Sequence, residues 1–154
     1  MNISVNIGNS VFPNPVTVAS GTFGHSDEHY GAKEVRCLGA VVPKTVTLKA
    51  QEGNPPRRIC ETPAGMINAI GIENAGIDAF IAQKLPKLKK IGVPLIISIS
   101  AHSDDDFALM AEKLNAAGGL AAVELNLSCP NLQKKVLVAQ DAAATASVVR
   151  RVKA

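Results

Sequence analysis

The sequence contains few aromatic residues, no tryptophan and little excess charge of either sign. Aromatic residues make up 3% of the 154 residues, and the formal net charge is +3. Nucleic-acid binding needs a concentrated basic surface and, for single strands, aromatic stacking platforms, so this composition argues against it. No apolar run reaches the about 18 residues that a membrane-spanning helix needs, and the N-terminus lacks the basic and apolar regions of a signal peptide. We therefore expect a cytoplasmic protein that binds neither nucleic acid nor a membrane.

Cysteine is also scarce, and its spacing offers no metal site. Cys37, Cys60 and Cys129 are far apart and include no Cys-x-x-Cys pair, which favours reduced thiols over a disulfide framework and indicates no zinc or iron–sulfur site in this chain. His25 and His29 have the i, i+4 spacing of a helical metal site, but no third ligand lies nearby in the sequence. We interpret them as part of a solvated helix start and predict no metal.

What remains is an ordinary globular composition with a clear alternation of strands and helices. With 47% hydrophobic and 19% charged residues, residues 1–154 are expected to form a single domain. A hairpin is predicted around Gly8-Asn9, from 3–7 and 10–12. Predicted parallel strands at 16–19, 39–42, 95–99 and 121–127 are separated by predicted helices at 26–36, 78–91 (divided at Pro86), from Ser103 to before Gly118, and 142–153. The fold class is therefore α/β with right-handed crossovers.

Two stretches of this pattern point to a functional site. Residues 48–76 show no helical period and are interrupted by glycine and proline, and so long an insertion is usually a functional loop. The strand at 121–127 has alternating apolar residues and is stopped by Pro130, which places Ser128, Cys129 and Asn131 at its carboxyl end. In parallel α/β folds the carboxyl ends of the strands carry the chemistry.

Several motifs together resemble one enzyme family. They are Asn14-Pro-Val with Ala19-Ser-Gly-Thr-Phe-Gly24, Lys44-Thr-Val-Thr-Leu, Glu52-Gly-Asn-Pro-Pro, Ile59-Cys-Glu-Thr-Pro-Ala-Gly-Met-Ile-Asn-Ala-Ile-Gly71, and Asn126-Leu-Ser-Cys-Pro-Asn131. The chain resembles the catalytic subunit of the class 1B dihydroorotate dehydrogenases over nearly all of its length. The resemblance implies the N-terminal half of a (β/α)8 TIM barrel with a short N-terminal β-hairpin, since a complete barrel needs roughly 250 residues. The chain is thus expected to be an incomplete, FMN-binding barrel.

The resemblance also implies a reaction and its partners. The family oxidises dihydroorotate to orotate in pyrimidine (UMP) synthesis, by removing a proton next to a carbonyl and passing a hydride to FMN. The class 1B resemblance further implies a separate electron-transfer subunit with FAD and an iron–sulfur cluster, which reduces NAD, and a homodimer within a heterotetramer.

Site residues follow from the resemblance position by position. The base is expected to be Cys129, acting as a thiolate. Residues expected at the substrate are Lys44, Asn68, Ile70, Gly71, Ile72, Asn126 and Asn131. Residues expected at the cofactor are Ala19, Ser20, Gly21, Lys44, Thr45, Ser98 and Asn126.

Simpler interpretations stay open from the residues alone. A cysteine at a strand end is often a small packing residue, a lysine there is often a surface side chain extending from a core strand, and the glycines at 21 and 24 also fit a plain turn. The sequence departs from the family pattern at Lys135-Val136 and Ala139-Gln140, after Asn131, and at Arg57, so the resemblance does not extend to how the loop closes over Cys129. Two other functions fit as well: an FMN oxidoreductase like dihydropyrimidine dehydrogenase, or a non-catalytic truncated fragment.

Overall fold

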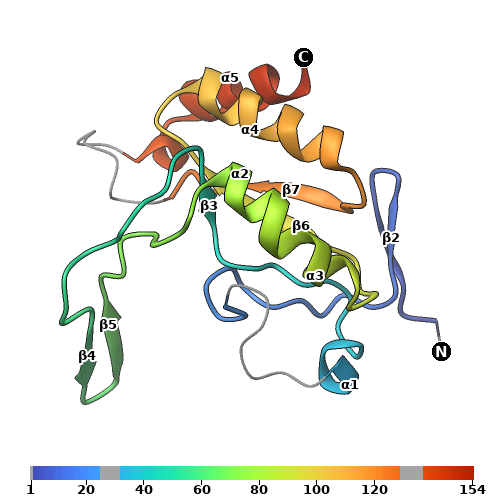
Figure 1. Ribbon diagram of the computed structural model, residues 1–154, viewed down its shortest axis with the longest axis horizontal. Helices are drawn as coiled ribbons and strands as arrows, with labels where there is room; N and C mark the ends of the chain where they lie inside the picture. The colour runs from blue at the N-terminus through green and yellow to red at the C-terminus, as the bar shows by residue number, and fades with distance from the viewer. Residues whose placement is uncertain (1, 25–31, 129–136) are drawn as a thin grey trace.

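Parallel strand segments form the centre of the protein (Figure 1). The computed structural model describes residues 2–24, 32–128 and 137–154. The three strands of the parallel sheet lie in the order β3, β6, β7, and they span Val46–Thr47, Ile96–Ser100 and Ala122–Leu125. Single parallel bridges join Thr17 to Ala40 and Val41 to Leu95, and they extend the pairing towards the N-terminus. The predicted parallel arrangement is therefore confirmed.

Three of the four predicted strands are shorter than the sequence indicated. The strand predicted at 121–127 is β7, Ala122–Leu125. The stretch 16–19 forms only the bridge at Thr17, and 39–42 only the bridges at Ala40 and Val41. The stretch 16–19 is shortened by a local contact, because the Val16 amide donates to the Asn14 side chain at 3.0 Å and not to a neighbouring strand. The Val16 carbonyl joins the next segment by accepting from the Gly39 amide at 2.7 Å.

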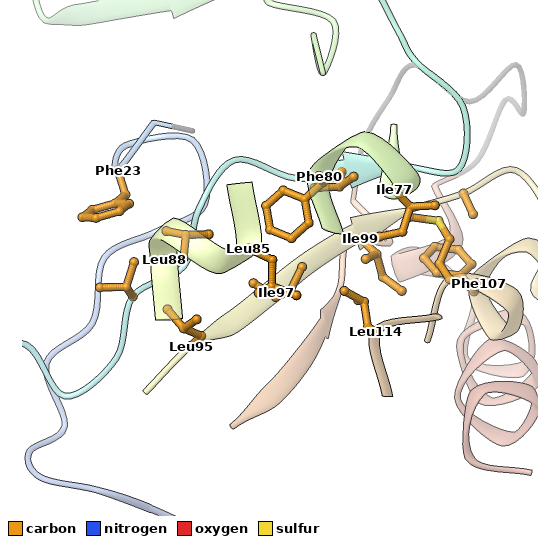
Figure 2. Close-up of a cluster of buried hydrophobic side chains, with 14 of the residues drawn as sticks. Phe23, Ile77, Phe80, Leu85, Leu88, Leu95, Ile97, Ile99, Phe107 and Leu114 are labelled. Atoms are coloured by element: carbon orange, nitrogen blue, oxygen red, sulfur yellow. The ribbon is translucent and has the colours of Figure 1, made fainter. Parts of the chain in front are cut away.

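A divided helix covers the apolar face of the sheet. It runs through α2 (Ile77–Ala79), the π-helical turn η1 (Phe80–Lys84) and α3 (Leu85–Lys89). The predicted division at Pro86 is confirmed: proline has no amide hydrogen to continue the α-helical pattern, and the Leu85 amide before it bonds to the Phe80 carbonyl, five residues back. Figure 2 shows Leu85 beside Ile97 of β6, with Phe80 next to it and Leu88 further along the helix. Ile97, Leu85 and Leu88 are almost fully buried, and each such side chain stabilises the fold by about 1.5–3 kcal/mol.

Two further helices pack beside each other against the other end of this core (Figure 1). The helix α4 (Asp104–Ala117) begins as predicted, with the Ser103 hydroxyl accepting from the Asp106 amide at 3.1 Å. The helix α5 (Ala142–Lys153) has the predicted bounds, but Val149, predicted on its apolar side, is 38% exposed and only Val148 is buried.

Polar contacts join α4 and α5 at their surface. Arg151 donates from Nε to Asp105 at 2.8 Å, and this hydrogen bond and the carboxylate charge raise the pKa of the guanidinium. The Ser147 hydroxyl donates to Asp104 at 2.5 Å. The acidic first turn of α4 is therefore matched by groups on α5.

Two hairpins flank the sheet. The first, β1 (Val5–Ile7) with β2 (Ser10–Phe12), confirms the predicted N-terminal hairpin, and the Ser10 hydroxyl ties it to the Ala121 carbonyl at 2.7 Å. The second, β4 (Ile59–Thr62) with β5 (Gly65–Asn68), corrects the expectation of an irregular insertion at 48–76. All eight of its strand residues are exposed, and it projects away from the sheet (Figure 1).

The remaining described helical pieces are short. They are α1 (Ala32–Val35), which covers part of the helix predicted at 26–36, and the 3-10 turn η2 (Val138–Gln140). Residues 25–31 lie outside the described part of the chain, so His25 and His29 have no structural test. Over the described ranges, no helix combines the length and apolar character needed to cross a bilayer.

Candidate functional site

The parallel sheet has one apolar and one polar face. Val46 pairs with Ile99, and Ile99 with Leu125, so these residues share the face that packs on the helices. Because side chains alternate along a strand, Thr45, Ser98 and Asn126 lie on the opposite face. The predicted cofactor residues on three successive strands are thus brought to one surface.

Hydrogen bonds connect these residues into a chain. The hydroxyls of Thr45 and Ser98 lie 3.0 Å apart, and both residues are buried. The side-chain nitrogen Nδ2 of Asn126 donates to the Thr45 hydroxyl at 3.3 Å, and the Ser128 hydroxyl donates to the side-chain oxygen Oδ1 of Asn126 at 3.2 Å. Since Thr45 accepts from Asn126, its own proton is available to Ser98. The chain therefore fixes which edge of the Asn126 amide carries the donors.

A bulge places Lys44 at the edge of this surface. Between the pairs Val41 with Leu95 and Val46 with Ile99, the first strand advances five residues and its partner four. The extra residue falls in the stretch that contains buried Pro43, which has no amide hydrogen for the ladder. Such bulges redirect side chains and are frequent next to active sites.

Lys44 lies close to the first predicted cofactor segment. Its amide donates to the Gly24 carbonyl at 2.8 Å, and its ammonium lies 3.6 Å from where a Cβ at Gly21 would stand. Gly21 has a φ of +91°, a conformation that L side chains rarely adopt. Gly21 lies in a turn that the Ala19 carbonyl closes by accepting from the Thr22 amide and hydroxyl. Ser20 lies in this turn between Ala19 and Gly21. The structure therefore brings 19–21 and Lys44 together.

The predicted substrate loop forms a separate, tightly bonded unit. Asn68 is the exposed last residue of β5, and it pairs with Ile59. The carbonyls of residues 69 to 72 each accept a hydrogen bond at 2.8–3.0 Å. The first two accept from the side chain and the main-chain amide of Asn54, the third from the side chain of Gln51 and the fourth from the side chain of Asn74.

Two residues of this loop have left-handed backbone conformations. Gly71 has a φ of +80° and Ile72 a φ of +50°. A β-branched residue in this region costs of order 1–3 kcal/mol, and it persists only where the surroundings enforce it. Gly71 has a second constraint, because a Cβ there would stand 2.7 Å from the Asn54 amide nitrogen. The loop is therefore held in one strained shape.

A cavity of about 320 Å³ opens at the carboxyl ends of β3 and β6. Its lining comes from the first residues after each strand and the start of α4, including Thr47, Gln51, Ser100, His102 and Asp106. Thr47 and Ser100 pair in register, two residues further along their strands than Thr45 and Ser98, and they therefore share the polar face. The cavity thus continues the polar face at the edge where a parallel sheet binds ligands.

Sequence reasoning missed the residues that hold the loop. Gln51, Asn54 and Asn74 were given no role, yet their side chains bond to its carbonyls. The available signal was the run Asn74-Ala-Gly76 before a helix, since Asn side chains often bond to backbone two residues on.

Two predicted site residues are not described by the structure, and the described residues offer no metal site. Cys129 and Asn131 lie outside the described residues, so the predicted base and the second substrate amide are not placed. Within the described part of the chain, no cluster of three or more His, Cys, Asp or Glu side chains could hold a metal ion.

Comparisons with known proteins agree with this arrangement. The sequence model of the family described as "Dihydroorotate dehydrogenase" matches residues 2–154. A protein of Desulforudis audaxviator is 44% identical over 151 residues, which cover 97% of this chain and 49% of that protein. A protein of Citrifermentans bemidjiense is 43% identical over 152 residues, covering 98% and 50% respectively. Both are named "Dihydroorotate dehydrogenase B (NAD(+)), catalytic subunit", and this chain spans about half the length of such relatives.

A solved structure supports the fold. The crystal structure of a dihydroorotate dehydrogenase from Eimeria tenella, in complex with ferulenol, superposes with a TM-score of 0.73 at 23% identity. The match covers 99% of this chain and 43% of that one. Together with the parallel order β3, β6, β7, it confirms the expected partial barrel.

Proposed function

Because the chain belongs to the dihydroorotate dehydrogenase family, we propose that the protein carrying it is an FMN-dependent catalytic subunit that oxidises dihydroorotate to orotate. The observation that supports this most is the chain of hydrogen bonds from Ser98 through Thr45 to Asn126 on the polar face of the sheet. It gathers predicted cofactor residues from three strands around one amide.

The described residues fit a flavin ring by the kind of groups they offer. Such a ring presents carbonyl oxygens and ring nitrogens, which the ammonium of Lys44 and the amide of Asn126 can match as donors. Gly21 has no side chain and is exposed, so its backbone is open to a flat ligand. Ser98 has no exposed surface, and we therefore place it behind Thr45, while the turn at 19–21 completes the contact set. A bound FMN would supply the hydride acceptor.

The chain itself would supply the base, the charge and the substrate contacts. We assign the base to Cys129, whose thiolate would take the proton next to the substrate carbonyl; a free thiol titrates near 8.5, so its site has to favour the anion. The ammonium of Lys44 would stabilise negative charge on the reacting groups. Asn68, Asn126 and Asn131 offer donors and acceptors together, as the edge of a pyrimidine requires, and residues 70–72 would complete the substrate contacts.

The names of the relatives guide the proposal for partners. They denote a catalytic subunit of an NAD-linked enzyme, so we propose that electrons leave through a separate subunit carrying FAD and an iron–sulfur cluster. A homodimer of the catalytic subunit within a heterotetramer, working in the cytoplasm in pyrimidine synthesis, completes this proposal.

The test is a visible spectrum of the full-length protein, purified with FMN and mixed anaerobically with dihydroorotate. A bound yellow flavin that bleaches is the expected result. Bleaching by dihydrouracil but not by dihydroorotate would replace the proposal with a dihydropyrimidine dehydrogenase-like activity. A protein that binds no flavin would refute the catalytic proposal.

A further inference from the structure

The side chain of Asn74 uses its whole hydrogen-bonding capacity within the fold. Its amide nitrogen donates to the Ile72 carbonyl and to the Thr47 hydroxyl, both at 2.8 Å. Its amide oxygen accepts from the Thr47 amide at 3.1 Å and the Gly76 amide at 2.8 Å. An asparagine side chain has two donor hydrogens and one oxygen with two lone pairs. Turning the amide over would set donors against donors, so this orientation is the one the surroundings permit.

These four bonds join the stretch 72–76 to Thr47, which lies 27 residues before Asn74 in the sequence. Thr47 is the last residue of β3, where it pairs with Ser100 of β6. Ile72 belongs to the predicted substrate loop, and Gly76 directly precedes α2. Asn74 itself is fixed by backbone hydrogen bonds to and from Gln51, both at 2.8 Å. The loop is therefore attached to the sheet edge that carries the candidate cofactor residues.

The bond to Ile72 also acts where the backbone is strained. The left-handed φ of +50° at Ile72 is unfavourable for a β-branched residue, and it follows a second left-handed residue, Gly71. Without the hydrogen bond to its carbonyl, Ile72 would have less to hold it in this conformation. Gln51 holds the Gly71 carbonyl from the same edge, at 2.8 Å.

We propose that Asn74 is a positioning residue, which holds residues 69–72 in the shape that receives the substrate at the carboxyl edge of the sheet. This inference rests on the proposed function for the identity of the substrate, dihydroorotate. Asn74 acts through Ile72 and Thr47, and its own polar atoms are all engaged within the fold.

The substitution Asn74→Asp separates the two halves of the network. A carboxylate keeps the acceptors for the Thr47 and Gly76 amides, but it has no hydrogen to give to the Ile72 carbonyl or to the Thr47 hydroxyl. The Thr47 hydroxyl can donate its own proton, whereas the Ile72 carbonyl cannot. In full-length protein we expect the KM for dihydroorotate to rise about tenfold or more, with a smaller change in kcat and an unchanged flavin content. A raised KM with kcat retained is the signature of lost substrate binding.

A matched control adds the same charge elsewhere. Asn9 is exposed in the turn between β1 and β2, and Asn9→Asp is expected to leave the KM unchanged. Ile72→Gly in the Asn74→Asp background provides a second check, because glycine accepts a left-handed conformation without strain. It should return the amide hydrogen exchange of residues 69–72 towards the parent value.

Amide hydrogen exchange distinguishes positioning from a general loss of stability. Faster exchange confined to residues 69–72 in Asn74→Asp, together with the raised KM, supports the proposal. Unchanged exchange and KM would overturn it, as would faster exchange that extends through β6 with loss of flavin. If the parent protein does not oxidise dihydroorotate, the proposed function fails, and the exchange measurement alone decides whether Asn74 orders the loop.

Discussion

Replacing Thr45 with valine tests the hydrogen-bond chain on the polar face of the sheet. Valine has nearly the shape of threonine but no hydroxyl, so Thr45→Val removes the group that joins Ser98 to Asn126. Ser98 is 0% exposed, and its hydroxyl then has no water to replace the lost partner. Asn126 is only half-buried, so solvent can satisfy its amide.

The size of the effect follows from this difference in burial. Leaving a buried hydroxyl without a partner costs about 1–3 kcal/mol, and we expect about 2 kcal/mol for Thr45→Val. Ser98→Ala should cost less, about 1 kcal/mol, because Thr45 still accepts from Asn126. Removing both hydroxyls leaves no buried group unpaired, so the double variant should lie within about 1 kcal/mol of the parent. The two single effects are thus expected not to add.

Urea unfolding of the flavin-free, full-length protein measures these free energies without a contribution from ligand binding. Thr17→Val is the matched control, because the Thr17 hydroxyl is exposed and donates to the Val18 carbonyl at 3.3 Å. Its expected effect is within about 0.5 kcal/mol. The reasoning would be refuted if Thr45→Val destabilised no more than this control, or if the double variant equalled the sum of the singles.

Three other substitutions, the first with a matched control, address two glycines and the proposed base. Gly39→Ala would put a Cβ 1.9 Å from the Asn14 carbonyl oxygen, so we expect a loss of about 3 kcal/mol in urea unfolding. Gly65→Ala, with nothing within 4 Å, should stay within about 0.5 kcal/mol of the parent, and an equal loss in both would contradict the steric argument. Gly21→Ala adds a methyl group at a φ of +91° beside the ammonium of Lys44, so flavin titration should show weaker binding. An unchanged affinity would remove Gly21 from the cofactor site. Cys129→Ser should keep the flavin but slow its reduction by dihydroorotate about 10²–10⁴-fold, whereas equal rates would exclude Cys129 as the base.

The sequence predicted those elements whose residues are buried in a regular pattern. The strand at 95–99 is a continuous apolar run, and β6 is buried on both faces. The helix at 142–153 follows an Asp141 side chain that accepts from two amides of its first turn, a signal that depends on neighbouring residues alone. Burial and capping are recorded locally in the sequence, which is why these bounds were predictable.

The hairpin of β4 and β5 was missed for the complementary reason. Its strand residues are all exposed, and they include large apolar side chains such as Met66 and Ile67 beside polar ones. Without one buried face, the alternation that identifies a strand is absent. Backbone pairing alone, from Ile59 with Asn68 to Thr62 with Gly65, defines this hairpin.

The candidate site shows the same division between local and distant information. Lys44, Thr45 and Asn126 follow recognisable strands, so their position at a sheet edge could be predicted from strand ends and family motifs. The role of Asn74 depends on contacts with Thr47, 27 residues earlier, and on a left-handed backbone at Ile72 that no residue preference favours. A strained residue held by a fully bonded neighbour is a tertiary feature, and its cost is acceptable only where the loop shape matters more than local preference. This is why a loop that violates local rules, and not the regular sheet beneath it, is the place to look for substrate recognition.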